Sequence, residues 1–173
     1  MRKNRIYSIC RLALLSALAI ALSTIESIFT PVLPPGAKAG LSNVVVMFAA
    51  SFLGLLPTLL IVAFKAVFAL LIRGVISFVL SLAGGLASAL LLWILFRFAR
   101  GLGVFGISIL GALCHSLSQL LVSCLLYGDA VLAYAPILIL LAIPGGLITA
   151  AALCVSESLI SRTKNRKRKG NRL

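Results

Sequence analysis

The basic residues of this chain are clustered, and long apolar runs separate the clusters. Thirteen of the sixteen lysines and arginines fall in three groups: Arg2, Lys3, Arg5 and Arg11; Arg97 and Arg100; and Arg162, Lys164, Arg166, Lys167, Arg168, Lys169 and Arg172. The runs between the groups are continuously apolar rather than alternating. This pattern indicates membrane-spanning helices and not the strands of an outer-membrane barrel.

The composition excludes a water-soluble fold. The hydrophobic fraction is 62%, the mean hydropathy is +1.20, and the chain has only three acidic residues. A soluble domain of this length needs a polar shell that these residues cannot supply. We therefore expect one all-α integral membrane domain over residues 1–173, in a multi-pass protein of a bacterial cell membrane.

The apolar runs predict a bundle of six transmembrane helices. As one helix, residues 41–72 would be about 48 Å long, too long for a hydrocarbon core of about 30 Å. Gly54 and Pro57 offer a turn that divides this run into two short spans. The predicted spans are 12–29, 41–56, 58–72, 76–98, 104–126 and 131–160, followed by a basic tail over 161–173.

The charge pattern predicts the orientation of the bundle. Basic clusters favour the cytoplasmic side, and an even number of spans places both termini and Arg97 there. Joining residues 41–72 into one helix would put the basic tail outside, which supports the turn independently of helix length. We expect the tail to contact anionic lipid rather than nucleic acid.

The first span has two distinct faces. Small residues recur every fourth position at Ala13, Ala17 and Ala21, a spacing that lets helices approach closely. Either ordinary packing within the bundle or docking to another membrane protein explains this stripe. Ser16, Ser23, Ser27 and Thr30 lie on another face, which favours a polar interior.

A second polar stripe lies in the fifth span. Ser108, His115, Gln119 and Ser123 are spaced by seven, four and four residues, which places them on one helical face. Lipid cannot satisfy such a stripe, so it faces protein or a cavity. His115 is either hydrogen-bonded inside the bundle or part of a lined cavity. Since no second histidine or nearby carboxylate accompanies it, we expect no metal site.

Three cations stand outside the clusters: Lys38, Lys65 and Arg73. Lys65 lies in mid-span, where an ionised lysine is costly unless it is paired, hydrated or bound to a ligand. One interpretation is a structural pair between Lys65 and Glu26. The other is a pocket for an anionic or zwitterionic solute that enters from outside, to which Asn43 and Gln119 add neutral hydrogen bonds.

Several of these stretches together resemble a known family. They are residues 38–43 (KAGLSN), Lys65, residues 81–86 (SLAGGL), 111–119 (GALCHSLSQ) and 144–148 (PGGLI). The chain resembles, over residues 8–158, the Gx transporter family, whose members are also labelled heptaprenyl diphosphate synthase component I.

The resemblance implies three different functions. The family is similar to the six-helix substrate-binding S components of energy-coupling-factor transporters. In those proteins an alanine stripe on the first helix docks to a shared transmembrane coupling subunit that works with ATPases, and the first outer loop covers the substrate. Ala13, Ala17, Ala21 and residues 30–40 match that arrangement. The synthase label implies instead an accessory subunit beside a soluble prenyltransferase, and some relatives are associated with flavin- or quinone-linked electron transfer.

We therefore expect a solute-binding protein of S-component type that needs a separate energising module. The expected ligand-binding residues are Lys65, Asn43, His115, Gln119, Lys38, Glu26 and Arg73. Two alternatives remain: the protein is a non-catalytic accessory subunit, or it is a purely structural scaffold. Because the chain has only three acids and no Asp-rich motif to hold magnesium and diphosphate, we expect no catalytic activity of its own. We also expect no cofactor.

Overall fold

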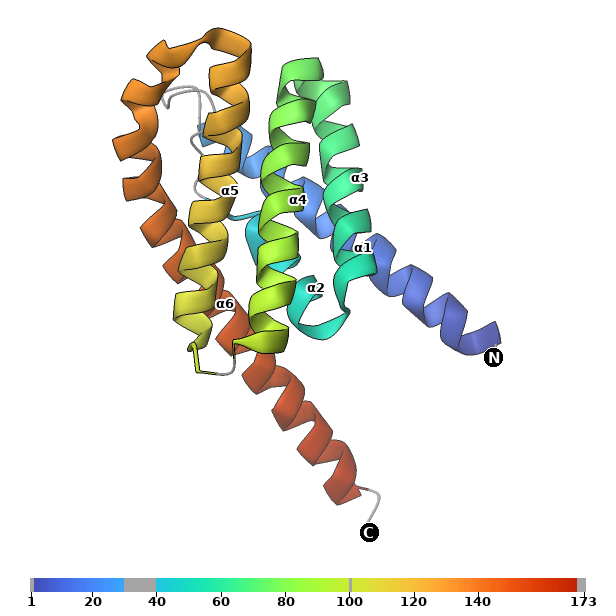
Figure 1. The fold of residues 1–173 in the computed structure, drawn as a ribbon. Helices are drawn as coiled ribbons and strands as arrows, with labels where there is room; N and C mark the ends of the chain where they lie inside the picture. Colours follow the sequence, from blue (N-terminus) through green and yellow to red (C-terminus); the bar gives the residue numbers. More distant parts are fainter. Residues whose placement is uncertain (1, 30–39, 100, 171–173) are drawn as a thin grey trace.

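The computed structural model describes the backbone of residues 2–29, 40–99 and 101–170, and side chains within 6–28, 40–99 and 101–163. The described chain is helical and forms a bundle (Figure 1), which confirms the predicted all-α class. The elements are α1 (Arg2–Phe29), α2 (Asn43–Phe52), α3 (Leu55–Arg73), α4 (Val75–Phe98), α5 (Val104–Tyr127), the 3-10 helix η1 (Asp129–Tyr134) and α6 (Ala135–Gly170).

Within the described residues, five helices are long and apolar enough to cross a membrane. The predicted span 41–56 is wrong in length, because α2 has only ten residues. At 1.5 Å per residue such a helix is about 15 Å long, roughly half of a hydrocarbon core. Figure 1 shows α2 in the lower part of the bundle only.

The predicted turn between the second and third helices is confirmed at Gly54. Its φ of +89° is a conformation that glycine adopts readily and other residues avoid. Pro57 lies inside the first turn of α3 rather than in the turn itself. A proline is tolerated there because the first N–H groups of a helix have no intrahelical acceptor. Thr58, also in the first turn, donates from Oγ1 back to the Gly54 carbonyl at 2.7 Å.

The first and the last helix of the chain extend beyond the predicted spans. α1 begins at Arg2 rather than at residue 12, and α6 continues to Gly170 instead of ending at residue 160. Lysine and arginine are good helix formers, so the basic ends continue the helices. The start of α1 and the end of α6 project from the same end of the bundle (Figure 1), where α4 also ends, with exposed Arg97 in its last turn.

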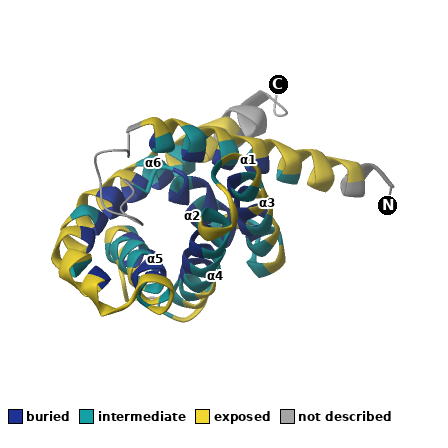
Figure 2. Cartoon of the chain, turned by 90° about the horizontal axis from the view of Figure 1, so that it is seen from above, coloured by how far each residue is buried: buried dark blue, intermediate teal, exposed yellow. Residues whose placement is uncertain are grey.

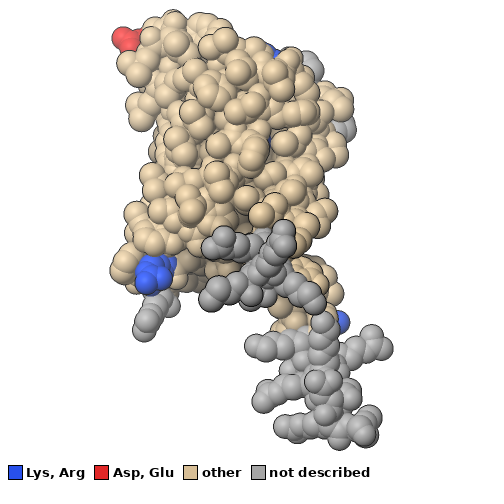
Figure 3. Space-filling view, turned by 90° about the vertical axis from the view of Figure 1, so that its right-hand side faces the viewer, with Lys and Arg blue, Asp and Glu red and all other residues tan. Residues whose placement is uncertain are grey.

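The helices pack around a common interior, toward which their buried residues point (Figure 2). α4 packs between α3 and α5, α5 packs against α6, and α1 contacts α3 and α2. Glycines allow the closest approaches: Gly85 of α4 lies against Val62, and Gly146 of α6 lies against Ile109. Many large hydrophobic side chains are exposed on the outside. In the middle of the face in Figure 3 the described residues are nearly all of other types than Lys, Arg, Asp and Glu, as lipid contact requires.

Candidate functional site

Two opposite charges lie inside the apolar bundle. Glu26 of α1 is 2% exposed and Lys65 of α3 is 3% exposed. Ser42 links them: Lys65 Nζ donates to Ser42 Oγ at 3.3 Å, and Ser42 Oγ donates to Glu26 Oε2 at 3.5 Å. A buried charge without a partner is strongly destabilising, so this link explains how both groups are held in the interior.

The segment before α2 brings Ser42 to this position. Gly40 has a φ of +81°, and its backbone N–H donates to Glu26 Oε1. The Gly40 carbonyl accepts from the N–H of Asn43 at 2.9 Å, which starts α2. The carboxylate therefore satisfies a backbone group that lipid could not satisfy. Glu26 holds the start of α2 against the end of α1.

Asn43 extends the polar interior toward α4, α5 and α6. Its side chain is buried, and its Oδ1 atom has no hydrogen-bond partner among the described residues. It borders a cavity of about 10 Å³ together with Ser88, Ser108 and Thr149. That is about the space that one water molecule requires, and the hydroxyl groups around it suit such an occupant.

The four residues of the predicted α5 stripe are all buried, which confirms that they share one inward face. His115 Nδ1 lies 3.3 Å from Ser88 Oγ, and Gln119 Nε2 donates to the Leu80 carbonyl of α4 at 3.1 Å. Gln119 Oε1 and Ser123 Oγ have no partner among the described residues. His115 and Gln119 therefore contact α4, and Gln119 and Ser123 have hydrogen-bonding capacity that the described residues do not use.

These contacts form one polar run across the bundle. It begins at Glu26 and Lys65, continues through Ser42 to its neighbour Asn43, crosses the small cavity to Ser88, and ends at His115. A family model described as heptaprenyl diphosphate synthase component I matches residues 15–155, which include the whole run. The chain belongs to this family. No curated protein and no solved structure matches the chain.

Some of the predicted site residues of this family member lie outside the polar run. Arg73 is half-buried and donates from Nη2 to Ser23 Oγ of α1 at 3.4 Å. It follows Lys65 by eight residues, or about 12 Å along α3, and it is the last residue of that helix. Lys38 and residues 30–39 of the predicted covering loop lie outside the described residues.

Two members of the run were missing from the sequence-based site. Ser42 lies inside the motif that carries the family resemblance, but no residue spacing shows that it lies between Glu26 and Lys65. Ser88 follows Gly84 by four residues on α4, and both are buried. This spacing puts a glycine and a hydroxyl on one helical face, which is the signal that could have identified Ser88.

The alanine stripe of α1 is not used inside the bundle. Ala13, Ala17 and Ala21 are exposed, so packing within the bundle is the wrong interpretation for them. The opposite face carries Ser16 and Ser23, which are buried as predicted for a polar interior. The open stripe of this family member is therefore available to lipid or to another membrane helix.

A metal site takes several histidine, cysteine or acidic ligands close together. Across residues 6–28, 40–99 and 101–163, no group of three or more histidine, cysteine or acidic side chains could hold a metal ion. The four cysteines are free. The chemistry that the polar run can perform is the binding of charge and of hydrogen-bonding groups.

Proposed function

We propose that this membrane protein binds an anionic or vitamin-like solute as the S component of a transporter. The observation that supports the proposal is the buried charged pair beside unused acceptors. Glu26 and Lys65 are linked through Ser42, while the oxygens of Asn43 and Gln119 lack partners among the described residues. An apolar core would fold the bundle without the cost of burying two charges. The presence of Glu26 and Lys65 in the interior therefore favours a role for them beyond folding.

In this proposal the solute's anionic group replaces Ser42 as the partner of Lys65. Asn43 Oδ1 and Gln119 Oε1 accept hydrogen bonds from the neutral part of the solute, and His115 contributes a ring nitrogen. The solute enters from the outer end, past Arg73, whose positive charge attracts it. Because the described cavity beside Asn43 is about 10 Å³, solute binding requires the helices around it to separate.

The exposed stripe Ala13–Ala17–Ala21 supports the second part of the proposal, docking to a transmembrane coupling subunit. Small side chains let another helix approach α1 closely, and these three alanines do not serve packing within the bundle. The energy for transport comes from ATPases on that subunit, because this sequence contains no P-loop.

Binding is tested with the full chain in lipid nanodiscs and a panel of anionic vitamins such as biotin, pantothenate and folate. We expect one of them to bind and Lys65→Met to weaken it at least about tenfold, since hydrogen bonds to charged groups contribute about 1.5–3 kcal/mol. Arg162→Gln, which changes an exposed tail residue, is the control and should bind normally. The solute-binding proposal fails if no panel member binds and Lys65→Met leaves cellular uptake of the panel unchanged.

Docking is tested by replacing the three stripe alanines with leucine. We expect the triple variant to keep solute binding and to lose co-purification with the coupling subunit. Ala151→Leu, at an exposed alanine of α6, is the matched control and should co-purify normally. Equal recovery of the coupling subunit with both variants would contradict the docking role of α1.

The family description favours a second candidate function, a non-catalytic subunit in polyprenyl diphosphate metabolism. Quinone metabolism and flavin- or quinone-linked electron transfer are variants of this candidate that rest on the resemblance in sequence alone. Three acidic residues in the whole chain argue against a catalytic role. This candidate predicts co-purification with a soluble prenyltransferase or a redox subunit. Recovery of coupling subunits and ATPases alone, from a mild-detergent extract, would argue against it.

A further inference from the structure

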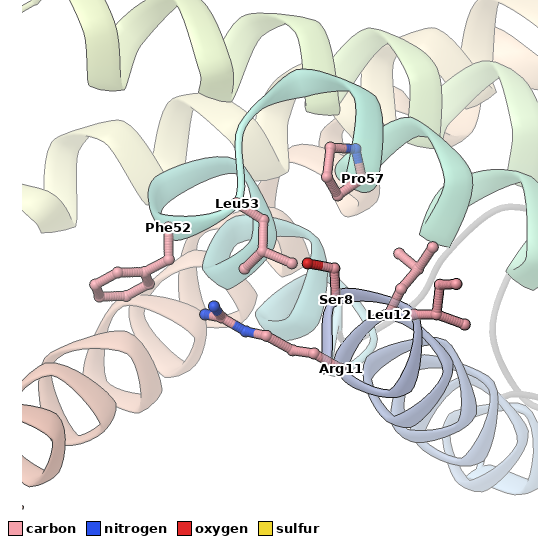
Figure 4. A pocket seen from close by; sticks show the side chains of 7 residues that line it. Ser8, Arg11, Leu12, Phe52, Leu53 and Pro57 are labelled. Carbon is pink, nitrogen blue, oxygen red and sulfur yellow. The ribbon is translucent and has the colours of Figure 1, made fainter. Parts of the chain in front are cut away.

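A second pocket lies at the end of the bundle from which the start of α1 and the end of α6 project. Its volume is about 360 Å³, and it lies between the first turns of α1 and the turn that joins α2 to α3. Five of its lining residues are apolar, and two, Ser8 and Arg11, are polar. Figure 4 shows the Ser8 and Arg11 side chains projecting from α1 toward Leu53 and Phe52.

The pocket combines one positive charge with an apolar wall. Arg11 is the charged member of the lining, and no lining residue is acidic. Ser8 precedes Arg11 by three residues, so the two side chains leave the same face of α1. Phe52, Leu53 and Pro57 form the opposite wall, where α2 ends and α3 begins. Such a lining suits an amphiphile with an anionic head.

The position of the pocket across the membrane supports the same occupant. The apolar span of α1 begins at Ile6, so Ser8 and Arg11 lie in its first two turns, where lipid headgroups meet their chains. An arginine near a helix end commonly reaches toward headgroups without binding one molecule. Here a partly enclosed volume beside Arg11 adds a place for a chain, which simple headgroup contact does not require.

We propose that this pocket binds an amphiphile whose head is a phosphoryl group with a net negative charge and whose tail is an apolar chain. The phosphoryl oxygens accept hydrogen bonds from the Arg11 guanidinium, whose planar fork matches phosphate, and from the Ser8 hydroxyl. The chain lies along Leu12, Leu53 and Phe52. Two sources supply this chemistry: an anionic phospholipid of the surrounding leaflet, or a prenyl diphosphate. The proposal does not depend on solute binding at Lys65.

The test is native mass spectrometry of the full chain titrated with phosphatidylglycerol, phosphatidylcholine, farnesyl diphosphate or inorganic phosphate. We expect one molecule of phosphatidylglycerol or of farnesyl diphosphate to bind saturably, and the tighter of the two identifies the source. Arg11→Gln should weaken it about tenfold, as expected for loss of a charge-assisted hydrogen bond. Arg11→Lys should weaken it less, because the charge remains without the fork.

Two further variants separate this site from general attraction to basic residues. Arg97→Gln removes an exposed arginine outside the pocket and should leave binding within about twofold. Leu53→Phe narrows the pocket but keeps Arg11, and should weaken chain-bearing ligands. The proposal is overturned if Arg11→Gln binds like the wild type, if phosphatidylcholine binds as tightly as phosphatidylglycerol, or if inorganic phosphate alone competes fully.

Discussion

The link between Glu26 and Lys65 makes a quantitative prediction about stability. Both groups are almost fully buried, at 2% and 3% exposure, and Ser42 lies between them. Lys65→Met leaves a buried carboxylate without its cation, and Glu26→Gln leaves a buried ammonium without its anion. Breaking a buried pair in this way costs about 3–5 kcal/mol. The double variant should be more stable than either single variant, because neither charge remains.

Unfolding is measured by detergent titration of the purified chain, with Trp93 as the reporter. It is the single tryptophan of the sequence and lies in α4. Because the double variant should lose less stability than either single variant, the coupling energy of the double-mutant cycle should exceed the cost of either single change, that is, about 3 kcal/mol or more. If each single change costs less than about 1 kcal/mol and the two effects add, the charges are not linked as the structure shows them.

The same double variant separates a structural pair from a ligand site. If Lys65 only balances Glu26, restoring stability with the double change should also restore whatever the protein binds or does. If Lys65 holds the solute, the double variant should be stable but should not bind it. A stable double variant that binds a solute with wild-type affinity would refute the assignment of Lys65 to ligand binding.

Three smaller changes test the packing around the polar run by the same unfolding assay. Gly84→Ala places a Cβ atom 2.7 Å from Gln119 Cγ and should cost about 1–3 kcal/mol through overpacking, whereas Gly106→Ala in α5 meets nothing so close and should be neutral or stabilising. Ser108→Ala removes a 2.6 Å hydrogen bond to a backbone carbonyl of α6 and should cost about 0.5–1.5 kcal/mol. Gly54→Ala forces alanine to a φ of +89° and should cost about 1–3 kcal/mol. Effects below a few tenths of a kcal/mol at all three sites would contradict these contacts.

Hydropathy and spacing predict much of this fold because they act locally. Continuous apolar runs locate the five long helices, and Gly54 interrupts the run 41–72 at the observed turn. The spacing of the polar residues on α5 predicts their common inward face, since helical periodicity depends only on sequence separation. The helix positions, the turn and the inward face of α5 can all be predicted from residues that are close together in the sequence.

The features that the sequence did not predict depend on contacts between distant residues. Hydropathy treats residues 41 and 42 as part of a span, but α2 begins only at Asn43 because Gly40 turns its N–H toward Glu26. Ser42 joins the site for the same reason. One serine among many in the sequence gives no sign that a carboxylate of another helix lies beside it.

The short α2 also affects how many membrane crossings can be inferred from the charge pattern. Basic clusters at both termini and around Arg97 predicted an even number of crossings, because all of them favour the cytoplasmic side. Among the described residues, however, five helices are long enough to cross. The start of α1 and the end of α6 nevertheless project from the same end of the bundle (Figure 1). Because α2 covers only about half of a hydrocarbon core, the described non-helical residues that precede it, 40–42, matter for how this part of the chain is stabilised.

Non-helical backbone at membrane depth is stable only where protein groups satisfy it. Glu26 does so for Gly40, and Lys65, through Ser42, balances the charge that this requires. The short helix and the buried charges therefore explain each other: a full-length second span would need neither. Such an arrangement also leaves the start of α2, with Asn43, at the centre of the polar run, where a solute that displaced Ser42 would loosen the attachment of α2 to α1.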